Sequence, residues 1–520
     1  MATELAGPAG AAAPRRVVAM IGFMGAGKST AARCAARALG GEALDIDRIV
    51  EQRLGKSIDR VFAQDGEPAF RAAEERITLE LLGAPQTLVL ALGGGAVASP
   101  AVRDALADHL VIWIDVDRDT AWARCRGTGR PLAADRRQFD RLYAERQPLY
   151  EALADIVVPH ERTREVAEVL TAAEGMPLRG RMLWAASASG DYPVYIGPGL
   201  LNSPAFWPPM VEGRRFLVTD GVVGRIHGER LPPVSGRVVI MPGEQSKTIA
   251  HAEIVWSELA RAGMTRADVV VALGGGVVGD LAGFCAATYQ RGVRYVQVPT
   301  TLVAQVDSAY GGKTGVDLEE AKNYVGAYHQ PRAVIADPDL LQTLPAPELA
   351  AGYAEVVKTA LIAGGALWER IRHGDDPTDA RLIAACAQAK LRIVAHDERD
   401  AGLRQTLNLG HTVGHAIETA TRYAVYRHGE AVGLGLLATL RLSGNDELRR
   451  EVAALLGARG LPTTLEGVDP DAVVMATARD KKRVGEGEVP FVLLAQPGAA
   501  QPGMTVAQRD LITAVRELAS

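Results

Sequence analysis

The sequence predicts an α/β protein with two parallel-sheet domains in succession, the second leading into an all-helical domain. Short β-branched runs such as RVVAMIG and HLVIWIDV alternate with amphipathic helical patterns, which is typical of parallel sheets covered by helices on both faces. At 520 residues the chain is also too long for a single core. Beyond about residue 345 the strand patterns stop and long helical patterns follow.

The domain boundaries follow from this alternation and from one stretch, EGMPLRGRMLWAASASG, which is rich in Gly, Ser and Ala and lacks periodicity. We expect a flexible tail over residues 1–14, a first α/β domain over 15–172, a linker over 173–189, a second α/β domain over 190–345 and a helical domain over 346–520.

Composition excludes several classes of protein. The net charge of −5 and the pI near 6.1 give no basic surface for nucleic acid, and no apolar run approaches the roughly 18 residues of a membrane span. The four cysteines are widely scattered, as expected for reduced thiols rather than a disulfide framework. In the opening MATELAGPAGAAAPRR the arginines follow the alanines, the reverse of a secretory signal. We therefore expect a cytoplasmic protein that acts on small molecules.

A phosphate-binding loop opens the first domain. GFMGAGKST (residues 22–30) fits the pattern GxxxxGK[ST] and stands between a predicted strand and a predicted helix. Its backbone N–H groups and the helix N-terminus can hold the phosphates of a nucleotide, with Lys28 on the outer phosphates and Ser29 on magnesium. The first domain is therefore predicted to bind a nucleoside triphosphate.

Further residues of the first domain indicate a carboxylate site. Arg71 in EPAFRAAE and Arg146 in YAERQPLY are far apart in the sequence and suit a clamp that binds a carboxylate through paired hydrogen bonds. Asp47 in LDID follows a second predicted strand and suits hydroxyl binding or orientation of a metal-bound water. The run ALGGGAV (residues 91–97) leaves bare backbone N–H groups at a strand end.

With these motifs, residues 15–172 resemble shikimate kinase, a P-loop kinase with a parallel sheet. The resemblance implies phosphorylation of the 3-hydroxyl of shikimate by ATP with Mg²⁺. It implies Lys28 and Arg130 as catalytic residues, the latter, in GRPLA, as the lid arginine over the transferred phosphoryl group. The implied ATP and magnesium residues are Gly25, Gly27, Lys28, Ser29, Thr30 and Asp45, and the implied shikimate residues are Asp47, Arg71, Gly94 and Arg146.

The second α/β domain repeats the glycine run as ALGGGVVGD (residues 272–280). Its flanks differ from those of the first run, so internal duplication is disfavoured. Asp280 follows the glycines too closely to be the ribose-binding acid of a GxGxxG fingerprint. A backbone cradle for a pyrophosphate at a helix N-terminus remains the natural interpretation, and Glu244 and Lys247 in PGEQSKT could hold a ribose.

Three histidines and a glutamate permit a metal site in the last domain. LNLGHTVGHAIE places His411 and His415 on one face of a helix, and YRHGEAVG adds His428. Such histidines can equally be structural or hydrogen-bonding. Together with Glu355 in AGYAEVVK they permit a zinc site of two histidines and one glutamate that keeps an open position for substrate.

Residues 190–500 resemble 3-dehydroquinate synthase, through the runs PGEQSKT, GGGVVGDLAGF, PTTLVAQVDSAYGGKTGVD, KNYVGAYHQP, AGYAEVVK and LNLGHTVGHAIE. The resemblance implies a Rossmann-like NAD domain, with NAD as a recycled catalyst and Zn²⁺ or Co²⁺ as Lewis acid. The implied substrate is 3-deoxy-D-arabino-heptulosonate 7-phosphate, which is oxidised at C5, loses phosphate, is reduced again and recloses its ring as 3-dehydroquinate.

The resemblance also implies the residues of this second site. The metal ligands would be Glu355, His411 and His428. The NAD set would be Asp220, Glu244, Lys247, Gly275, Gly276, Asp280, Thr300, Thr301 and Lys322. The substrate set would be Arg291, Lys313, Asn323, Lys358, Lys390, Arg404, Asn408, His415 and Lys482 or its neighbour Lys481. The catalytic residues would be Asp307, Lys313, Lys358 and His415. In the family Arg291 reaches the phosphate pocket of a neighbouring subunit, which implies a homodimer.

One position departs from the family pattern. The family usually reads DExExG before the histidine motif, whereas this chain reads DERDAG, with Asp400 where Glu is usual. The carboxylate is one methylene shorter, which is expected to weaken a hydrogen bond that supports the site.

The sequence predicts a bifunctional fusion and leaves two alternatives open. In the first, one half is active and the other is a nucleotide-binding regulatory module. In the second, the C-terminal half is a polyol dehydrogenase of the iron-dependent alcohol dehydrogenase type, which shares the fold and the glycine loop but releases NADH during turnover.

Overall fold

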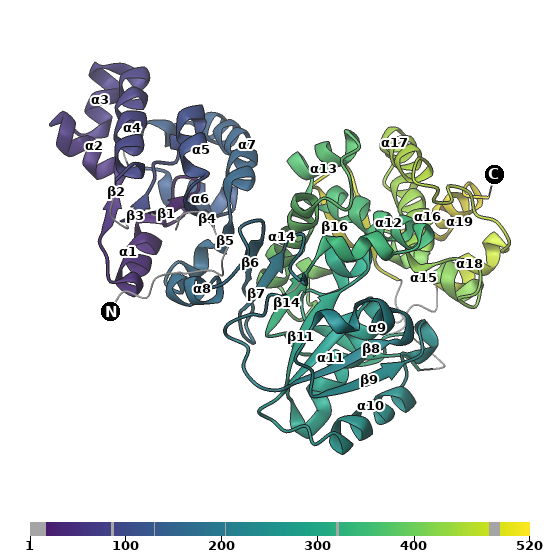
Figure 1. The fold of residues 1–520 in the computed structure, drawn as a ribbon. Coiled ribbons are helices and arrows are strands. Elements are labelled where there is room, and N and C mark those ends of the chain that lie inside the picture. Colours follow the sequence, from purple (N-terminus) through teal and green to yellow (C-terminus); the bar gives the residue numbers. More distant parts are fainter. Residues whose placement is uncertain are drawn as a thin grey trace. The chain divides into compact units, whose positions relative to one another are not determined.

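The computed structural model describes residues 17–84, 88–128, 130–202, 204–318, 322–477 and 489–519. The chain divides into two units (Figure 1), the first comprising residues 1–186 with 206–210, the second comprising 187–205 with 211–520. Within each unit, neighbouring strands of the main sheet run parallel, so the predicted α/β class is confirmed. The expected tail over residues 1–14 lies outside the described residues.

The first unit has the strand order β2-β3-β1-β4-β5-β6. Its strands are β1 (Val17–Ile21), β2 (Ala43–Asp45), β3 (Leu88–Ala91), β4 (Leu110–Asp115), β5 (Ile156–Pro159) and β6 (Arg181–Ala185). Its helices are α1 (Lys28–Leu39), α2 (Ile46–Leu54), α3 (Ile58–Gln64), α4 (Gly66–Leu82), α5 (Pro100–Leu106), α6 (Arg118–Cys125), α7 (Arg136–Leu153) and α8 (Val166–Ala172).

Strand β6 lies within the segment 173–189 that the sequence suggests to be an irregular linker. Its residues RMLWA contain no β-branched side chain, so the usual strand signal is missing. Burial and pairing instead make it a strand: four of its five residues are buried, and it runs parallel to β5 with Met182 opposite Ile156.

Helices α2, α3 and α4 share a small core of their own. Ile46, Val50, Val61, Phe70 and Ile77 are all at most 4% exposed and pack together. This cluster holds α2 and α4 in place, and these helices carry Asp47 and Arg71 of the predicted shikimate site. Because the apolar face of each helix packs into the cluster, the polar side chains on its other faces point away from it.

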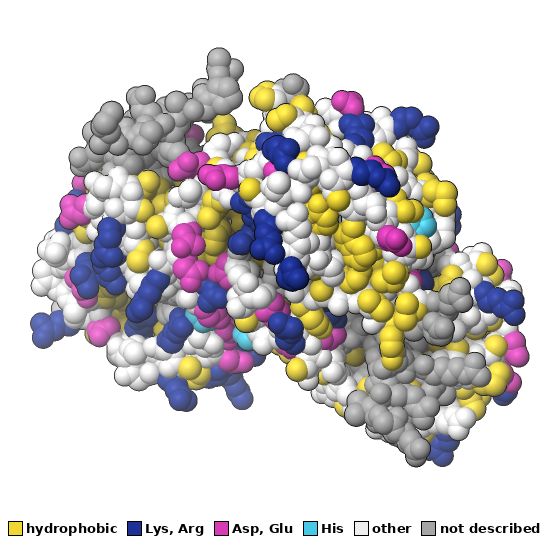
Figure 2. Space-filling model, turned by 90° about the horizontal axis from the view of Figure 1, so that it is seen from below, with side chains coloured by type: hydrophobic (Ala, Val, Ile, Leu, Met, Phe, Trp, Pro, Cys, Tyr) yellow, Lys and Arg dark blue, Asp and Glu magenta, His cyan; other side chains and the backbone are white. Residues whose placement is uncertain are grey.

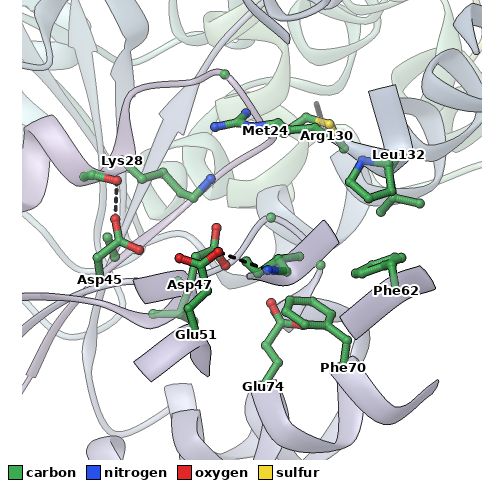
Figure 3. Close-up of a pocket in the computed structure, with 18 of the residues that line it drawn as sticks. Met24, Lys28, Asp45, Asp47, Glu51, Phe62, Phe70, Glu74, Arg130 and Leu132 are labelled. Atoms are coloured by element: carbon green, nitrogen blue, oxygen red, sulfur yellow. Dashed lines mark hydrogen bonds between the residues drawn. The ribbon is translucent and has the colours of Figure 1, made fainter. Parts of the chain in front are cut away.

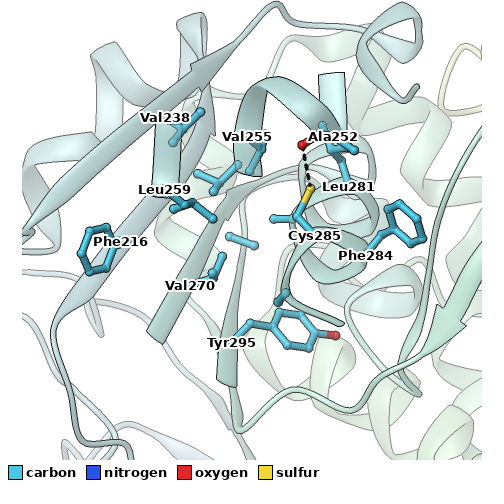
Figure 4. Packing of buried hydrophobic residues seen from close by; sticks show 14 of the residues in the cluster. Phe216, Val238, Ala252, Val255, Leu259, Val270, Leu281, Phe284, Cys285 and Tyr295 are labelled. Atoms are coloured by element: carbon cyan, nitrogen blue, oxygen red, sulfur yellow. Dashed lines mark hydrogen bonds between the residues drawn. The ribbon is translucent and has the colours of Figure 1, made fainter. Parts of the chain in front are cut away.

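The second unit has the strand order β7-β14-β11-β10-β8-β9. These strands are β7 (Tyr192–Ile196), β8 (Arg215–Asp220), β9 (Gly236–Ile240), β10 (Val269–Gly274), β11 (Arg294–Pro299) and β14 (Ala333–Ala336), and β12 (Lys313–Val316) forms an antiparallel hairpin with β13 (Val325–Tyr328). The helices in this part are α9 (Gly221–His227), α10 (Ile249–Arg261) and α11 (Gly276–Thr288). Helices α10 and α11 bury Val255, Leu259 and Leu281 against Phe216 and Val270 of the sheet (Figure 4).

The rest of the second unit is mainly helical. Its helices are α12 (Ala346–Ala363), α13 (Gly365–Arg372), α14 (Ala380–His396), α15 (His411–Ala420), α16 (His428–Leu442), α17 (Asp446–Gly457), α18 (Pro470–Thr477) and α19 (Gln508–Arg516). The expectation that no strand follows residue 345 needs correction, because β15 (Phe491–Leu494) and β16 (Ala500–Met504) form an antiparallel hairpin. The apolar run FVLL is too short for its periodicity to separate a strand from a helix.

The face drawn in Figure 2 agrees with the small net charge. On the face drawn in Figure 2, Lys and Arg side chains lie interspersed with Asp and Glu. Among the described residues, no helix combines the length and the apolar character that crossing a bilayer requires.

Helices α15 and α16 approach so closely that their backbones touch. A side chain at Gly435 of α16 would place its Cβ 2.0 Å from the carbonyl oxygen of Gly410 and 2.8 Å from the amide nitrogen of Gly414. Glycine is therefore required at this crossing. The close approach brings the first residues of the two helices, His411 and His428, near one another, with ring centroids 5.4 Å apart.

We expect Gly435→Ala to lower the free energy of unfolding of the second unit by about 1–3 kcal/mol, because its methyl group forces the helices apart. Gly433→Ala is the matched control in the same helix. The added methyl group would lie 3.4 Å from Leu456 Cδ1, which is an ordinary contact. Because alanine favours a helix more than glycine does, Gly433→Ala should leave the free energy of unfolding unchanged or raise it by up to about 1 kcal/mol. Urea denaturation followed by circular dichroism measures both, and equal losses would contradict the proposed packing.

Candidate active sites

One cavity of the first unit gathers all of the residues predicted for it. It has a volume of about 490 Å³ and lies between the phosphate loop, α2, α4, the first glycine run and α7 (Figure 3). Its lining includes Gly25, Gly27, Lys28, Ser29, Thr30, Asp45, Asp47, Arg71, Gly94, Arg130 and Arg146.

The phosphate loop has the backbone that its glycines permit. Gly25 and Gly27 have φ of +81° and +100°, in the left-handed region that favours glycine. Ser29 donates a hydrogen bond of 2.6 Å to Asp45 Oδ2, and Lys28 donates one of 3.1 Å to the carbonyl of Phe23. Burial, together with Arg130 nearby, lowers the pKa of Lys28. A phosphate in the loop would reverse this effect by supplying the missing negative charge.

Arg71 and a glutamate that the sequence did not reveal pack over the first glycine run. Arg71 forms ion pairs with Glu74 at 2.6 Å and Glu67 at 3.0 Å. A Cβ at Gly95 would lie 2.2 Å from Arg71, and one at Gly93 would lie 2.0 Å from Glu74. Gly93 and Gly95 must therefore be glycine, because Arg71 and Glu74 occupy the space that larger side chains at these two positions would need.

Glu74 is 2% exposed, and burial raises its pKa despite the neighbouring arginine. Its spacing of three residues from Arg71 on one helix is the signal that could have identified it. Arg146 of α7 also lines the cavity and is buried, with its guanidinium 5.7 Å from the ring centre of Phe23. Tyr150 donates a hydrogen bond of 2.6 Å to the carbonyl of Gly94. Arginines from α4 and α7 thus face one cavity.

In the second unit Glu355, His411 and His428 converge from α12, α15 and α16. The Nε2 atoms of His411 and His428 lie 3.6 Å and 3.5 Å from Glu355 Oε1, and the candidate ligand atoms lie within 4.8 Å of one another. Glu355 is 1% exposed, and its Oε1 accepts no hydrogen bond from the described residues. A buried carboxylate oxygen facing two imidazole nitrogens fits a divalent cation of the zinc type.

A chain of buried charges continues from Glu355. Lys358 Nζ lies 2.5 Å from Glu355 and 2.6 Å from Asp307, which stands in a π-helical turn, Ala304–Ser308. Lys390 contacts the same carboxylate and donates a hydrogen bond of 2.7 Å to the carbonyl of Asp307. Burial alone would raise the pKa of Asp307, but the two ammonium groups hold it well below its ordinary value.

The second glycine run forms a bare helix N-terminus. Gly275 precedes α11, and a Cβ there would lie 2.9 Å from Thr301, while one at Gly276 would lie 3.2 Å from Ser308. The amide of Thr300 donates to the carbonyl of Gly274 at 3.0 Å. Backbone that excludes side chains at a helix N-terminus fits the pyrophosphate of a dinucleotide.

Charged residues surround this helix N-terminus. Lys247 forms a 2.6 Å ion pair with Asp280 and also contacts the amide oxygen of Asn323. Lys322 lies 3.4 Å from Glu244. Asp220 instead caps α9, accepting hydrogen bonds from the amides of residues 222 and 223. The predicted NAD residues are thus grouped around β8, β10 and α11, although Asp220 is engaged in capping.

The remaining predicted residues have varied positions. Lys313 contacts Asp400, so the shorter carboxylate at the atypical position still reaches a partner. Arg404 is buried and donates to the carbonyls of Gly311 and Glu398 at 2.9 and 2.5 Å. Asn408 ends the short helix before α15, and Arg291 is exposed beyond α11. Lys481 and Lys482 lie outside the described residues.

Comparison with known proteins identifies a family for each unit. The family models for the N-terminal and C-terminal parts of 3-dehydroquinate synthase match residues 237–351 and 352–483. A 3-dehydroquinate synthase of Halorhodospira halophila is 44% identical over 336 residues, covering 62% of this chain and 94% of the relative. The chain belongs to the 3-dehydroquinate synthase family. The shikimate kinase model matches residues 24–174, so the first unit adds a shikimate kinase domain to this synthase.

Solved structures resemble the synthase unit. A 2-epi-5-epi-valiolone synthase of Streptomyces hygroscopicus with NAD⁺ and Zn²⁺ bound is 29% identical with a TM-score of 0.58, covering 63% of this chain and 96% of its own. A 2-deoxy-scyllo-inosose synthase complexed with carbaglucose-6-phosphate, NAD⁺ and Co²⁺ is 25% identical with a TM-score of 0.59, covering 65% and 99%. The family match favours a synthase over the polyol dehydrogenase alternative.

The synthase unit also contains a site residue that the sequence did not reveal. Glu418 of α15 is 2% exposed, and its two oxygens lie 3.3 Å from His428 Nδ1 and 3.3 Å from Lys322 Nζ. Burial alone would raise the pKa of Glu418, but these neighbours lower it to about 2. The sequence feature that could have identified Glu418 is its spacing of seven residues from His411, which puts both side chains on one face of the helix.

We expect Asp307→Asn to lower the free energy of unfolding at pH 7 by about 3–5 kcal/mol, because Lys390 loses its counter-charge and Lys358 keeps only Glu355 of its two carboxylate partners. The pKa of Asp307 is lower in the folded protein than in the unfolded chain, where it is about 3.9. Its carboxylate therefore stabilises the fold fully above that unfolded pKa, and this stabilisation is lost as the pH falls through the pKa of the folded protein. The difference between variant and wild type should therefore be constant near neutrality and shrink in acid.

Urea denaturation at several pH values measures this difference. Asp376→Asn is the control, since Asp376 is exposed and its side chain accepts hydrogen bonds from Thr378 in the same turn. An equal loss of stability in both variants, or a loss that grows in acid, would contradict the assigned role of Asp307.

Proposed function

We propose that the first unit transfers a phosphoryl group from ATP with Mg²⁺ to the 3-hydroxyl of shikimate. The observation that carries the proposal is the single cavity in which the phosphate loop faces Asp47, Arg71 and Arg146. The loop would hold the nucleotide, Ser29 and Asp45 would orient the magnesium, and the arginines would bind the carboxylate of the acceptor. Burial raises the pKa of Asp47, which suits a group that exchanges a hydrogen bond with the attacking hydroxyl.

We propose that the second unit converts 3-deoxy-D-arabino-heptulosonate 7-phosphate into 3-dehydroquinate and phosphate. The convergence of Glu355, His411 and His428 beside the lysine cluster carries this proposal. The related synthases solved with NAD⁺ and Zn²⁺ or Co²⁺ support the same cofactors here. When bound, the metal would act as a Lewis acid and NAD as a temporary hydride acceptor.

The chain's own residues would bind and orient the substrate in this reaction. Lys358 and Lys390 form a positively charged wall that suits a carboxylate or phosphate, and Asp307 keeps both ammonium groups in place. His415 stands on the same helix face as His411, with ring centroids 5.3 Å apart, and would lie toward the phosphate. Lys313 and Arg404 would complete the anion site.

Two further features belong to the proposal. Exposed Arg291 would reach the phosphate pocket of a neighbouring copy, so we propose a homodimer through the synthase unit, in the cytoplasm. The two reactions are not consecutive steps of aromatic biosynthesis, so no intermediate would pass directly between the units.

A phosphorus NMR time course on the full chain tests both activities in one sample. It contains ATP, Mg²⁺, shikimate, catalytic NAD, Zn²⁺ and the heptulosonate phosphate. Growth of a shikimate phosphate signal together with conversion of the heptulosonate signal to inorganic phosphate would support both activities. If one signal stays constant, the corresponding unit is a regulatory module instead.

We expect Arg146→Leu to raise the KM for shikimate about 10- to 100-fold, the loss of a charged hydrogen bond worth roughly 1.5–3 kcal/mol, and the KM for ATP far less. Arg141→Leu is the control, because Arg141 is exposed on the same helix. Steady-state kinetics with each substrate varied separately measure both constants. A similar rise in both would remove Arg146 from the acceptor site.

We expect His428→Ala to abolish dehydroquinate formation and stoichiometric zinc binding while phosphorylation of shikimate continues. The imidazole supplies one of three ligands, whereas the kinase residues lie in the other unit. His373→Ala, on an exposed histidine, should change neither activity. Zinc content is measured by metal analysis, and dehydroquinate formation and shikimate phosphorylation are each assayed separately. Stoichiometric zinc retained in His428→Ala would disprove the assignment of His428 as a ligand.

A further inference from the structure

The side chain of Glu418 joins the metal-binding residues to the dinucleotide-binding residues of the synthase unit. It is buried, and each of its oxygens has a different partner. Oε2 lies 3.3 Å from Nδ1 of His428, and Oε1 lies 3.3 Å from Nζ of Lys322. A carboxylate so deeply buried is stable only when such partners compensate its charge.

On the metal side, Glu418 determines which nitrogen of His428 is available. If Nδ1 carries the proton and donates to Glu418, Nε2 presents its lone pair. That nitrogen is the one that lies 3.5 Å from Glu355 Oε1. Histidines that bind metals commonly donate their other N–H to a carboxylate, which fixes the ring and strengthens its basicity.

On the dinucleotide side, Glu418 fixes the position of Lys322. The ammonium group of Lys322 lies 4.2 Å from the ring centre of Tyr423 and 3.4 Å from Glu244, so it is held from three directions. Lysine has a long and flexible side chain, and such contacts reduce the entropy lost when it binds a ligand. Removing Glu418 would loosen both side chains, leaving Lys322 with Glu244 and Tyr423 and His428 with Glu355.

The same residues could instead hold a second cation, because ligand atoms of His415, Glu418 and His428 lie within 4.8 Å of one another. The ammonium group of Lys322 against Glu418 opposes this use, since a divalent cation would lie close to a fixed positive charge. The positioning role is therefore favoured.

Building on the proposed function of the synthase unit, we propose that Glu418 is a positioning residue that couples the metal site to the dinucleotide site. Its carboxylate orients His428 toward the metal and Lys322 toward the dinucleotide. The affinity for the metal and the affinity for the dinucleotide should therefore both depend on Glu418, although its side chain contacts neither ligand.

The test uses the full chain with Glu418→Gln, whose amide cannot accept from both partners as a carboxylate does. We expect zinc affinity, measured by competition with a chromogenic chelator, to fall about 10- to 100-fold. NAD affinity, measured by calorimetry on metal-free protein, should fall several-fold. In a Lys322→Gln background, Glu418→Gln should cause little further loss of NAD affinity, because the contact is already broken.

Asp268→Asn is the matched control, because Asp268 is also buried and paired, with Arg214 and Thr265 away from the site. It should lower stability without changing either affinity. If Glu418→Gln does not fold, Glu418→Asp replaces it: the shorter carboxylate keeps its charge but should still weaken zinc binding, and retention of wild-type zinc affinity by this variant would overturn the proposal.

The outcomes separate this inference from the proposed function. Wild-type zinc and NAD affinities in Glu418→Gln would overturn the inference alone. Two zinc ions per wild-type chain, reduced to one in the variant, would overturn it in favour of a second metal position. A wild-type chain that binds neither zinc nor NAD would overturn the proposed function of the synthase unit and the inference with it.

Discussion

Both sites depend on backbone that approaches other atoms too closely for a side chain. In the kinase unit Arg71 and Glu74 occupy the space above the first glycine run, and in the synthase unit Thr301 occupies the space beside Gly275. At the crossing of α15 and α16 the constraint is stricter, because backbone meets backbone and His411 and His428 come together as a result. The two similar glycine runs therefore make room for different side chains. The first run leads into a three-residue helical turn, whereas the second leads directly into the long helix α11.

Once the backbone is fixed, buried charge determines how the synthase site can act. Glu355, Lys358, Asp307 and Lys390 form an alternating series in which each ammonium group is balanced by a carboxylate. Such a series is costly to bury and gains its stability only when every member is present. It also leaves ammonium groups beside the candidate metal ligands, where the proposed anionic substrate would need them. The charges that hold the site together are thus the charges that would recognise the substrate.

The sequence could predict those parts of the sites whose chemistry follows from local spacing. The phosphate loop, the histidines one helical turn apart and the strand-end glycines each carry such spacing. The structure brings the phosphate loop and the first glycine run to one cavity, and it brings His411 beside Glu355 and His428. Glu74 and Glu418 were missed because a glutamate on a helix is usually exposed, and only tertiary packing buries these two. Strand β6 and the hairpin of β15 and β16 were missed because short runs without alternation form strands only through partners distant in sequence.

Fusion of the two enzymes does not require shared catalytic groups. The cavity of the kinase unit draws its lining from residues 24–146, and the described members of the synthase set come from residues 220–428. Each unit also has its own series of parallel strands and its own hydrophobic cluster. Because the products and substrates of the proposed reactions do not follow one another, linkage would not raise the local concentration of any intermediate. The covalent connection would then fix a one-to-one ratio of the two proposed activities.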